Sequence, residues 1–192
     1  MEHQVADKPM TKRVNGVDVS QLFATIDAIK GTPDIAKFKF RASNEWINGG
    51  HNRTTITDFY GVREDHPHEQ PFVLDEDEHQ VLLGEDQGPN PVEYLLAGLI
   101  GCLTSSLVYH AAARGITIRG IRSRLEGNID LRGFLGLSPD VKVGYENIRV
   151  YFKIDADLSE AQKEELIQMA QKYSPVFNTV ANPTPVSVNL ER

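Results

Sequence analysis

One side chain in this sequence is a strong nucleophile, the thiol of Cys102, which is the only cysteine among 192 residues. A cysteine attacks as its thiolate, so a reactive Cys102 needs positive charge or hydrogen-bond donors near its sulfur. The residue lies about three turns inside a predicted helix, and the helix dipole acts only within the first turn. A cation from another segment or subunit is therefore required, and the candidates are Arg53, Arg41 and His51. Without such a cation, Cys102 would be a small buried hydrophobic side chain.

The helix that carries Cys102 is predicted to begin after Asn90, a suitable N-cap. A proline fits its first position, and Glu93 lies three residues after the cap, as in a capping box. Gly115 provides the stop signal. The helix is apolar on nearly all faces, which is typical of a core helix or a membrane span. Polar residues between Thr104 and His110 interrupt the apolar run, so we expect a core helix and no membrane.

Composition narrows the class of protein. With 40% hydrophobic and 24% charged residues, the chain is typical of a soluble globular protein. Its first ten residues, MEHQVADKPM, lack the apolar core of a secretory signal, so we expect the cytoplasm. A single cysteine excludes an internal disulfide framework and a cysteine-based zinc site. The net charge of -7, without a basic stripe, argues against nucleic acid as a partner.

The part of the chain before the central helix is predicted to contain an arm and a hairpin. Residues 1–35 form the arm, with a short amphipathic helix over 18–30, and residues 36–192 form the domain. Alternating side chains over 37–46 predict a half-buried strand. A turn at Asn48-Gly49-Gly50 and a β-branched run over 54–60 complete a hairpin.

The acidic stretch from 63 to 88 is expected to be mainly a loop, with one short strand near 80–83. His66 and His68 form an H-x-H pair among its carboxylates, which could bind a divalent cation. The spacing matches no known site, and a solvated acidic loop is the other interpretation. We therefore expect neither a metal nor a cofactor.

The part after the central helix alternates between strands and helices. Strands are predicted over 116–131, 148–156 and 186–190, and a helix capped by Ser159 is predicted over 158–173. Ser174 is expected to cap a further short turn that begins at Pro175. The element order predicts an α+β fold, with antiparallel sheet packed on the central helix.

Together these features resemble the OsmC/Ohr family of thiol-dependent peroxidases. Asn90-Pro91 is followed eleven residues later by Cys102, and then by a strand pair, a helix and Ser174-Pro175. The resemblance covers about residues 36–190. It implies an OsmC-like α+β domain, with antiparallel sheets packed on the long central helix that carries Cys102. It also implies an intertwined homodimer with active sites at the subunit interface.

In that family a peroxidatic cysteine, helped by an arginine and a glutamate, reduces organic hydroperoxides or hydrogen peroxide. A second cysteine then resolves the sulfenic acid as a disulfide. The resemblance puts Cys102 at the first position and Ser174 at the second, and a serine cannot form a disulfide.

The two helper positions are also altered. The family glutamate position holds Val92, with Glu93 one residue later. The family arginine falls at or near His51, with Arg53 two residues on. The candidate catalytic residues are therefore Cys102, Arg53, Glu93 and His51.

Three functions remain open at this stage. The first is a peroxidase that uses one cysteine, a small peroxide as substrate and an external thiol as reductant. The second is a redox-silent protein of the same fold that binds a small hydrophobic or thiol ligand in the dimer-interface pocket. The third is an enzyme of acyl or thioester chemistry with Cys102 as nucleophile. A cation near Cys102 favours the first and third functions over the second.

Overall fold

The structure is a computed structural model that describes residues 12–191. The first ten residues, on which the expectation of a cytoplasmic protein rests, lie outside the described part. The chain divides into two compact units between Tyr94 and Leu95, and each unit is described by itself.

The first unit begins with a small hairpin and a helix. Strands β1 (Arg13–Val14) and β2 (Val17–Asp18) pair antiparallel, and α1 (Val19–Gly31) follows directly. Asp18 caps α1, since its carboxylate accepts a hydrogen bond of 3.0 Å from the N–H of Gln21. The helix predicted over 18–30 is therefore confirmed. A 3-10 turn, Pro33–Ala36, comes next. The separation of an arm at residue 35 stays a prediction.

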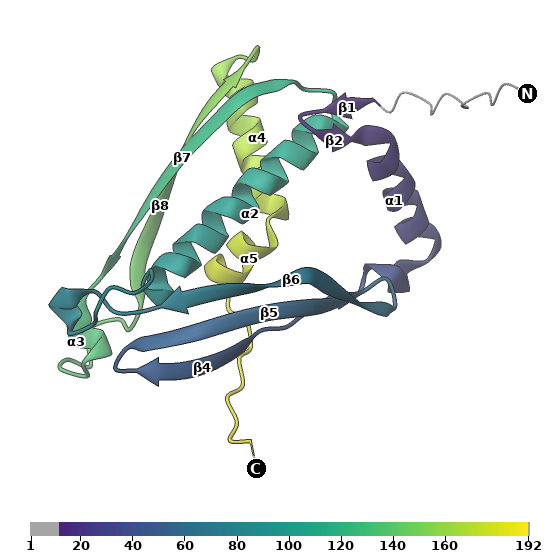
Figure 1. Ribbon diagram of the computed structural model, residues 1–192. Coiled ribbons are helices and arrows are strands. Elements are labelled where there is room, and N and C mark those ends of the chain that lie inside the picture. The colour runs from purple at the N-terminus through teal and green to yellow at the C-terminus, as the bar shows by residue number, and fades with distance from the viewer. Residues whose placement is uncertain (1–11, 192) are drawn as a thin grey trace, which may run out of the picture. The chain divides into compact units, whose positions relative to one another are not determined.

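The sheet of the first unit is built around β5 (His51–Gly61), as Figure 1 shows. On one side β5 pairs with β3 (Lys39–Phe40) and β4 (Ser43–Asn48), and on the other with β6 (Glu64–Glu76). All these pairs are antiparallel. The predicted hairpin is confirmed as β4 and β5.

The strand expected over 37–46 is interrupted, and the pairing with β5 explains why. Phe40 pairs with Phe59, but Ser43 pairs with Thr55, so three residues of β5 face only two between these pairs. The pairing of β5 with β6 shifts at the same place, between Ile56 and Asp58. An extra residue of this kind bends a strand and breaks its ladder.

The prediction that residues 63–88 form mainly a loop is wrong. Thirteen of them make β6, and Gln80–Leu82 is a 3-10 turn instead of a strand. Pro67 and Pro71 suggested a loop, because proline has no N–H for a sheet. Among the described strands β6 pairs only with β5, and an edge strand tolerates proline.

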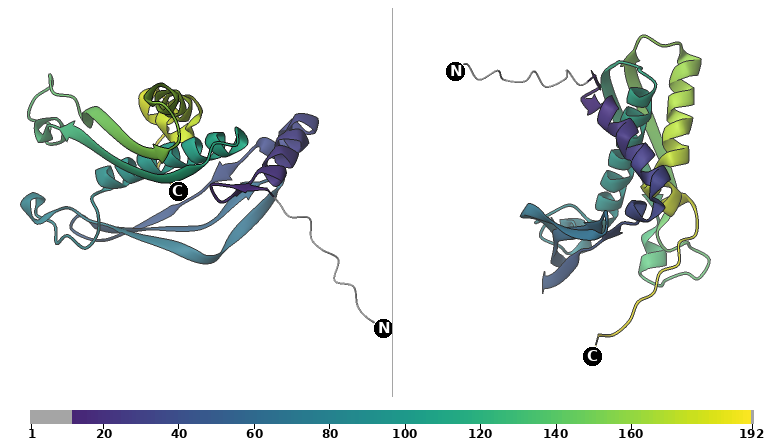
Figure 2. Two further views of the ribbon diagram at one scale, coloured as in Figure 1. Left: turned by 90° about the horizontal axis from the view of Figure 1, so that it is seen from above. Right: turned by 90° about the vertical axis from the view of Figure 1, so that its right-hand side faces the viewer.

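The second unit contains most of α2, two long strands and two further helices. The strands β7 and β8 pair antiparallel and run side by side in the views of Figures 1 and 2. The bounds are α2 (Pro91–Ala113), β7 (Ile118–Ile129), α3 (Leu131–Phe134), β8 (Tyr145–Ala156), α4 (Glu160–Tyr173) and α5 (Pro175–Ala181). These confirm the central helix, the two strands and the helix capped by Ser159, which closes a full capping box.

The strand predicted over 186–190 is wrong. The described residues after α5 form no helix or strand, and Val186, Val188 and Leu190 are exposed. Alternating apolar residues become a strand only when a neighbouring strand takes up their backbone hydrogen bonds. None does so within the described chain.

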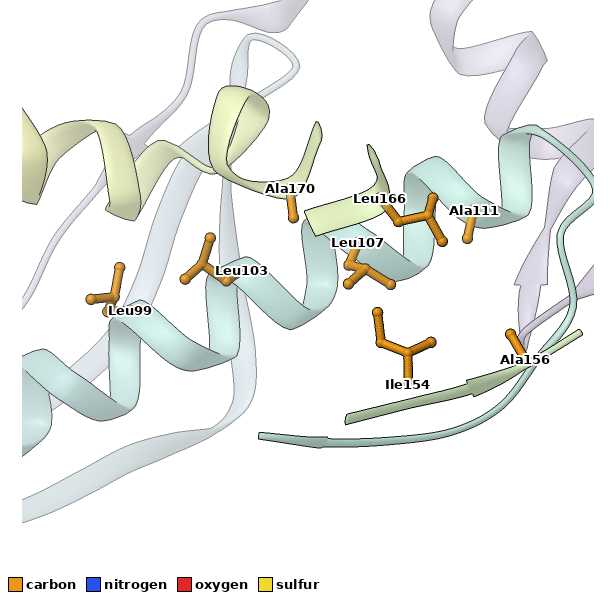
Figure 3. Packing of buried hydrophobic residues seen from close by; sticks show 8 residues of the cluster. All are labelled: Leu99, Leu103, Leu107, Ala111, Ile154, Ala156, Leu166 and Ala170. Carbon is orange, nitrogen blue, oxygen red and sulfur yellow. The ribbon is translucent and has the colours of Figure 1, made fainter. Parts of the chain in front are cut away.

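One apolar stripe of α2 forms the core of the second unit. It packs against one face of β8 and against α4, as Figure 3 shows. The cluster consists of Leu99, Leu103, Leu107, Ala111, Ile154, Ala156, Leu166 and Ala170. By length and composition, α2 is the one described helix that could cross a membrane. The buried stripe of α2 agrees with the prediction of a core helix.

Candidate active site

Cys102 lies on α2, half-buried, beside the buried hydroxyl of Ser174. Ser174 Oγ donates a hydrogen bond of 3.1 Å to Cys102 Sγ. Among the described residues, the Ser174 hydroxyl is the hydrogen-bond partner of the Cys102 sulfur. Both residues belong to the second unit, although 72 positions separate them in the chain. The side chain that the resemblance puts at the second cysteine position therefore does contact the first.

The position of Ser174 follows from the junction of two helices. Its N–H continues α4 by donating to the carbonyl of Ala170 at 2.9 Å, and its carbonyl accepts from the N–H of Asn178 at 3.0 Å. Its Oγ caps α5 by accepting from the N–H of Phe177 at 3.1 Å. The predicted cap is confirmed, and it anchors the hydroxyl that contacts Cys102.

His51 and Arg53, the candidate cations, converge on one carboxylate in the first unit. They lie two residues apart on β5 and so face the same side of the sheet. Asp75 of β6 meets both: its Oδ1 is 3.0 Å from His51 Nε2, 2.9 Å from Arg53 Nε and 2.8 Å from an Arg53 terminal nitrogen. Hydrogen bonds from His51 and then Arg53 hold the pKa of the Asp75 carboxyl below its ordinary value. Asp75 is a partner that the local sequence pattern did not predict, because it comes from the neighbouring strand.

Arg41, the third candidate cation, is held by other carboxylates of the same sheet. Its Nε lies 2.7 Å from Asp58, and a terminal nitrogen bonds Asp65. The hydrogen bond to Asp65 is the main reason why the pKa of Arg41 is raised. Acidic residues of β6 are thus paired with basic ones on β5 and on the segment between β3 and β4.

Glu93 closes the predicted capping box at the start of α2. Its Oε2 accepts a hydrogen bond of 2.9 Å from the N–H of Asn90. In return, Asn90 Oδ1 accepts from the N–H of Val92 at 3.1 Å. The Glu93 carboxylate therefore has a structural role at the start of α2.

A cavity of about 540 Å³ opens in the second unit, and neither Cys102 nor Ser174 is among its lining residues. Its lining is mainly apolar and comes from α2, β8 and α5, including Leu95, Leu99, Ile148, Val150, Phe177 and Val180. Leu99 precedes Cys102 by one helical turn, and the N–H of Phe177 bonds Ser174. An apolar cavity of this size can hold a small organic molecule.

Residues 84–189, more than half of the chain, match the family described as OsmC-like protein. The chain belongs to the OsmC-like family. Within the matched range lie Cys102, Ser174 and the cavity, whereas His51 and Arg53 precede it.

Individual relatives agree with this assignment. A hydroperoxide reductase from Mycoplasma genitalium is 25% identical over 107 residues, which are 55% of this chain and 72% of the relative. The solved OsmC-like protein from Mycoplasma pneumoniae aligns with a TM-score of 0.57 at 20% identity, over 74% of this chain and 87% of that one. An organic hydroperoxide resistance protein from Legionella pneumophila aligns with a TM-score of 0.52 at 17% identity, over 73% and 89%. The two solved structures confirm the predicted OsmC-like α+β fold.

Three other histidines in the described part of this OsmC-like protein, His66, His68 and His110, have structural partners. His66 stacks on Phe59 and lies 3.0 Å from the carbonyl of Gly61, and His68 packs edge-on against Phe72. Residues 12–191 contain no group of three or more side chains placed to hold a metal ion. His110 packs against Tyr173, and burial, followed by the nearby Arg114, lowers its pKa.

Proposed function

We propose that this OsmC-like protein is a thiol-dependent peroxidase that reduces organic hydroperoxides or hydrogen peroxide through Cys102 alone. The observation that carries the proposal is the contact between Cys102 and Ser174. A nucleophile sits beside a hydroxyl at the position where the resemblance implies a second cysteine, so the reductant must come from solution. The names of the relatives from Mycoplasma genitalium and Legionella pneumophila support chemistry on hydroperoxides.

The first half of the proposed cycle oxidises the sulfur. The thiolate of Cys102 attacks the distal oxygen of the peroxide, and the O–O bond breaks. One proton is taken up, so the products are a sulfenic acid on Cys102 and an alcohol, or water when the substrate is hydrogen peroxide. The sulfur loses two electrons and the peroxide gains them.

The second half of the cycle restores the thiol. An external thiol condenses with the sulfenic acid, which releases water and leaves a mixed disulfide on Cys102. A second external thiol attacks that disulfide, frees Cys102 and leaves as the oxidised reductant. A dithiol can supply both sulfurs from one molecule.

Two features bear on the substrate and on activation. The mainly apolar cavity, whose lining includes Leu99 one helical turn before Cys102, favours peroxides that carry an organic group. Positive charge for the thiolate is proposed to come from Arg53 or His51, which share the carboxylate of Asp75.

We also propose a soluble homodimer that works in the cytoplasm. Large apolar side chains are exposed on the sheet of the first unit: Phe40 is 78% exposed and Trp46 is 70% exposed. An obligate dimer interface covers surface of this kind. Sedimentation equilibrium should give twice the chain mass of 21.4 kDa, and a chain that stays monomeric at micromolar concentration would contradict the dimer.

Consumption of cumene hydroperoxide tests the activity. Dithiothreitol and then dihydrolipoamide serve as reductants, for the wild type and for Cys102→Ser. We expect turnover that disappears in the variant. Turnover that persists without Cys102 would refute the proposal. The absence of turnover in the wild type, with Cys102 inert to a thiol-labelling reagent, would refute it as well and direct attention to a ligand for the cavity.

A further inference from the structure

We infer that Ser174 is a positioning residue that activates Cys102: its hydroxyl donates to the sulfur and favours the thiolate over the thiol. The inference rests on the proposed function only for its effect on peroxide turnover. The state of the thiol itself can be measured without any peroxide.

The proton of the Ser174 hydroxyl is directed at the sulfur by the local hydrogen bonds. A serine hydroxyl has one proton to donate and two lone pairs that accept. The N–H of Phe177 occupies one lone pair of Oγ at 3.1 Å. The proton therefore has to point elsewhere, and Cys102 Sγ lies 3.1 Å away in the direction of donation.

The contact strengthens when the thiol loses its proton. With a neutral thiol, the S–H group can donate to the second lone pair of Oγ, or the hydroxyl can donate to a weakly accepting sulfur. With a thiolate, the hydroxyl donates to a full negative charge, and such charge-assisted hydrogen bonds are roughly twice as strong as neutral ones. This difference between the two states is what shifts the equilibrium towards the reactive thiolate.

Burial and backbone contacts keep the hydroxyl where it is. Ser174 has 0% of its surface exposed, so water does not compete for its proton. Its backbone is held by Ala170 on one side and by Asn178 on the other. The side-chain amide of Asn178 adds a third bond, at 2.9 Å, to the carbonyl of Ser174. A donor that is already oriented needs no reorganisation when the charge forms.

The replacement of a thiol by a hydroxyl thus has two consequences at one position. The sulfenic acid cannot be captured inside the chain, and the sulfur gains a donor with a fixed direction. Ser174 would in this way take over part of the activation that sequence reasoning assigned to cations alone.

The pH dependence of alkylation of Cys102 by iodoacetamide tests this role. Cys102 is the only cysteine, so the label reports on one site. In Ser174→Ala, we expect the midpoint of the profile to move up by about one pH unit. At neutral pH, oxidation of the thiol by cumene hydroperoxide should slow by about tenfold. Ser174→Thr, which keeps a hydroxyl, should restore the midpoint.

A matched control separates this effect from the loss of a helix cap. Ser159 caps α4 through the same kind of bond, since its Oγ accepts from the N–H of Gln162, and it has no bond to Cys102. Ser159→Ala should therefore leave the alkylation profile unchanged. If Ser174→Ala fails to fold, Ser174→Gly removes the hydroxyl as well, and glycine is tolerated better than alanine at an N-cap.

Two results would overturn the inference. One is a midpoint that is the same in the wild type and in Ser174→Ala or Ser174→Gly. The other is an equal shift in Ser159→Ala, because that shift would come from helix capping. Absent turnover in the wild type, together with a shifted midpoint in Ser174→Ala, would refute the peroxidase and support the role of Ser174.

Discussion

The hydroxyl of Ser174 lies 3.1 Å from the sulfur of Cys102, at the end of α4 and against the side of α2. A disulfide needs its two sulfurs at about 2.0 Å, so a thiol at position 174 would have to approach by roughly 1 Å. The hydroxyl therefore lies in contact with the sulfur, but the chemistry of the site is that of a single thiol.

Ser174→Cys should convert this contact into a disulfide. Under mild oxidation we expect the variant to lose both free thiols, because the two side chains already touch. Closing a loop of this length should raise the free energy of unfolding by about 2–4 kcal/mol relative to the reduced variant. Thiol titration and urea denaturation measure the two effects. Ser159→Cys is the control with an extra thiol elsewhere in the same unit, and two thiols that stay free in Ser174→Cys would contradict the prediction.

Arg53→Ala should slow peroxide turnover by at least about tenfold if Arg53 supplies positive charge to the thiolate. Arg41→Ala is the matched control, since Arg41 also lies in the first unit and is also paired with carboxylates. We expect Arg41→Ala to reduce cumene hydroperoxide at the wild-type rate. Steady-state kinetics with cumene hydroperoxide checks both variants, and equal losses would show that the sheet, and not the charge of Arg53, is responsible.

At Glu93, the cap and the charge can be separated by two substitutions. The amide oxygen of a glutamine can accept the bond that Glu93 now accepts from the N–H of Asn90. Glu93→Gln should therefore keep the stability and most of the turnover, whereas Glu93→Ala should lose about 1 kcal/mol of stability. Urea denaturation and peroxide kinetics on both variants provide the readouts. A hundredfold loss of turnover in Glu93→Gln would instead assign a catalytic role to the carboxylate.

Asp75, which contacts His51 and Arg53, should make the free energy of unfolding depend on pH in the acidic range. The folded protein holds the pKa of Asp75 below the ordinary value of 3.8, first through His51 and then through Arg53. Between the folded and the ordinary pKa of Asp75, the unfolded chain binds more protons than the folded chain. The stabilisation by Asp75 is therefore complete above the ordinary pKa and is lost as the pH falls through the lower folded pKa.

Comparison of Asp75→Asn with the wild type tests that dependence. The difference in unfolding free energy between them should be largest near neutral pH and should shrink as the pH falls below about 4. Asp27→Asn removes an exposed carboxylate paired with Lys30 and serves as the control. A difference for Asp75→Asn that stays constant down to pH of about 3 would contradict the prediction.

Local patterns were sufficient for most helices. Asn90, Ser159 and Ser174 were each identified as caps, and each accepts the hydrogen bond expected of a cap. A cap acts on backbone groups two or three residues away, so its signal is contained in the neighbouring sequence. The same is true of the β4–β5 hairpin, whose turn lies between adjacent strands.

The predictions were wrong for β6 and for residues 186–190, because a strand forms only where another strand pairs with it. β6 contains two prolines and many acids, and it is a strand because β5 provides hydrogen bonds along one edge. Residues 186–190 alternate as a strand should, but no described strand pairs with them. Pairing depends on distant segments, which a local pattern does not contain.

The sequence by itself determined the family resemblance, the central helix and the identity of the one nucleophile. It did so because the Asn-Pro cap and the spacing to Cys102 are short-range patterns, and the order of elements can be followed along the chain. Only the tertiary structure decided which side chains meet: Ser174 with Cys102 across 72 residues, and His51 and Arg53 on Asp75 across 24 and 22. Contacts between distant segments follow from helix packing and strand register, and they assign Ser174 a donor's position beside the thiol.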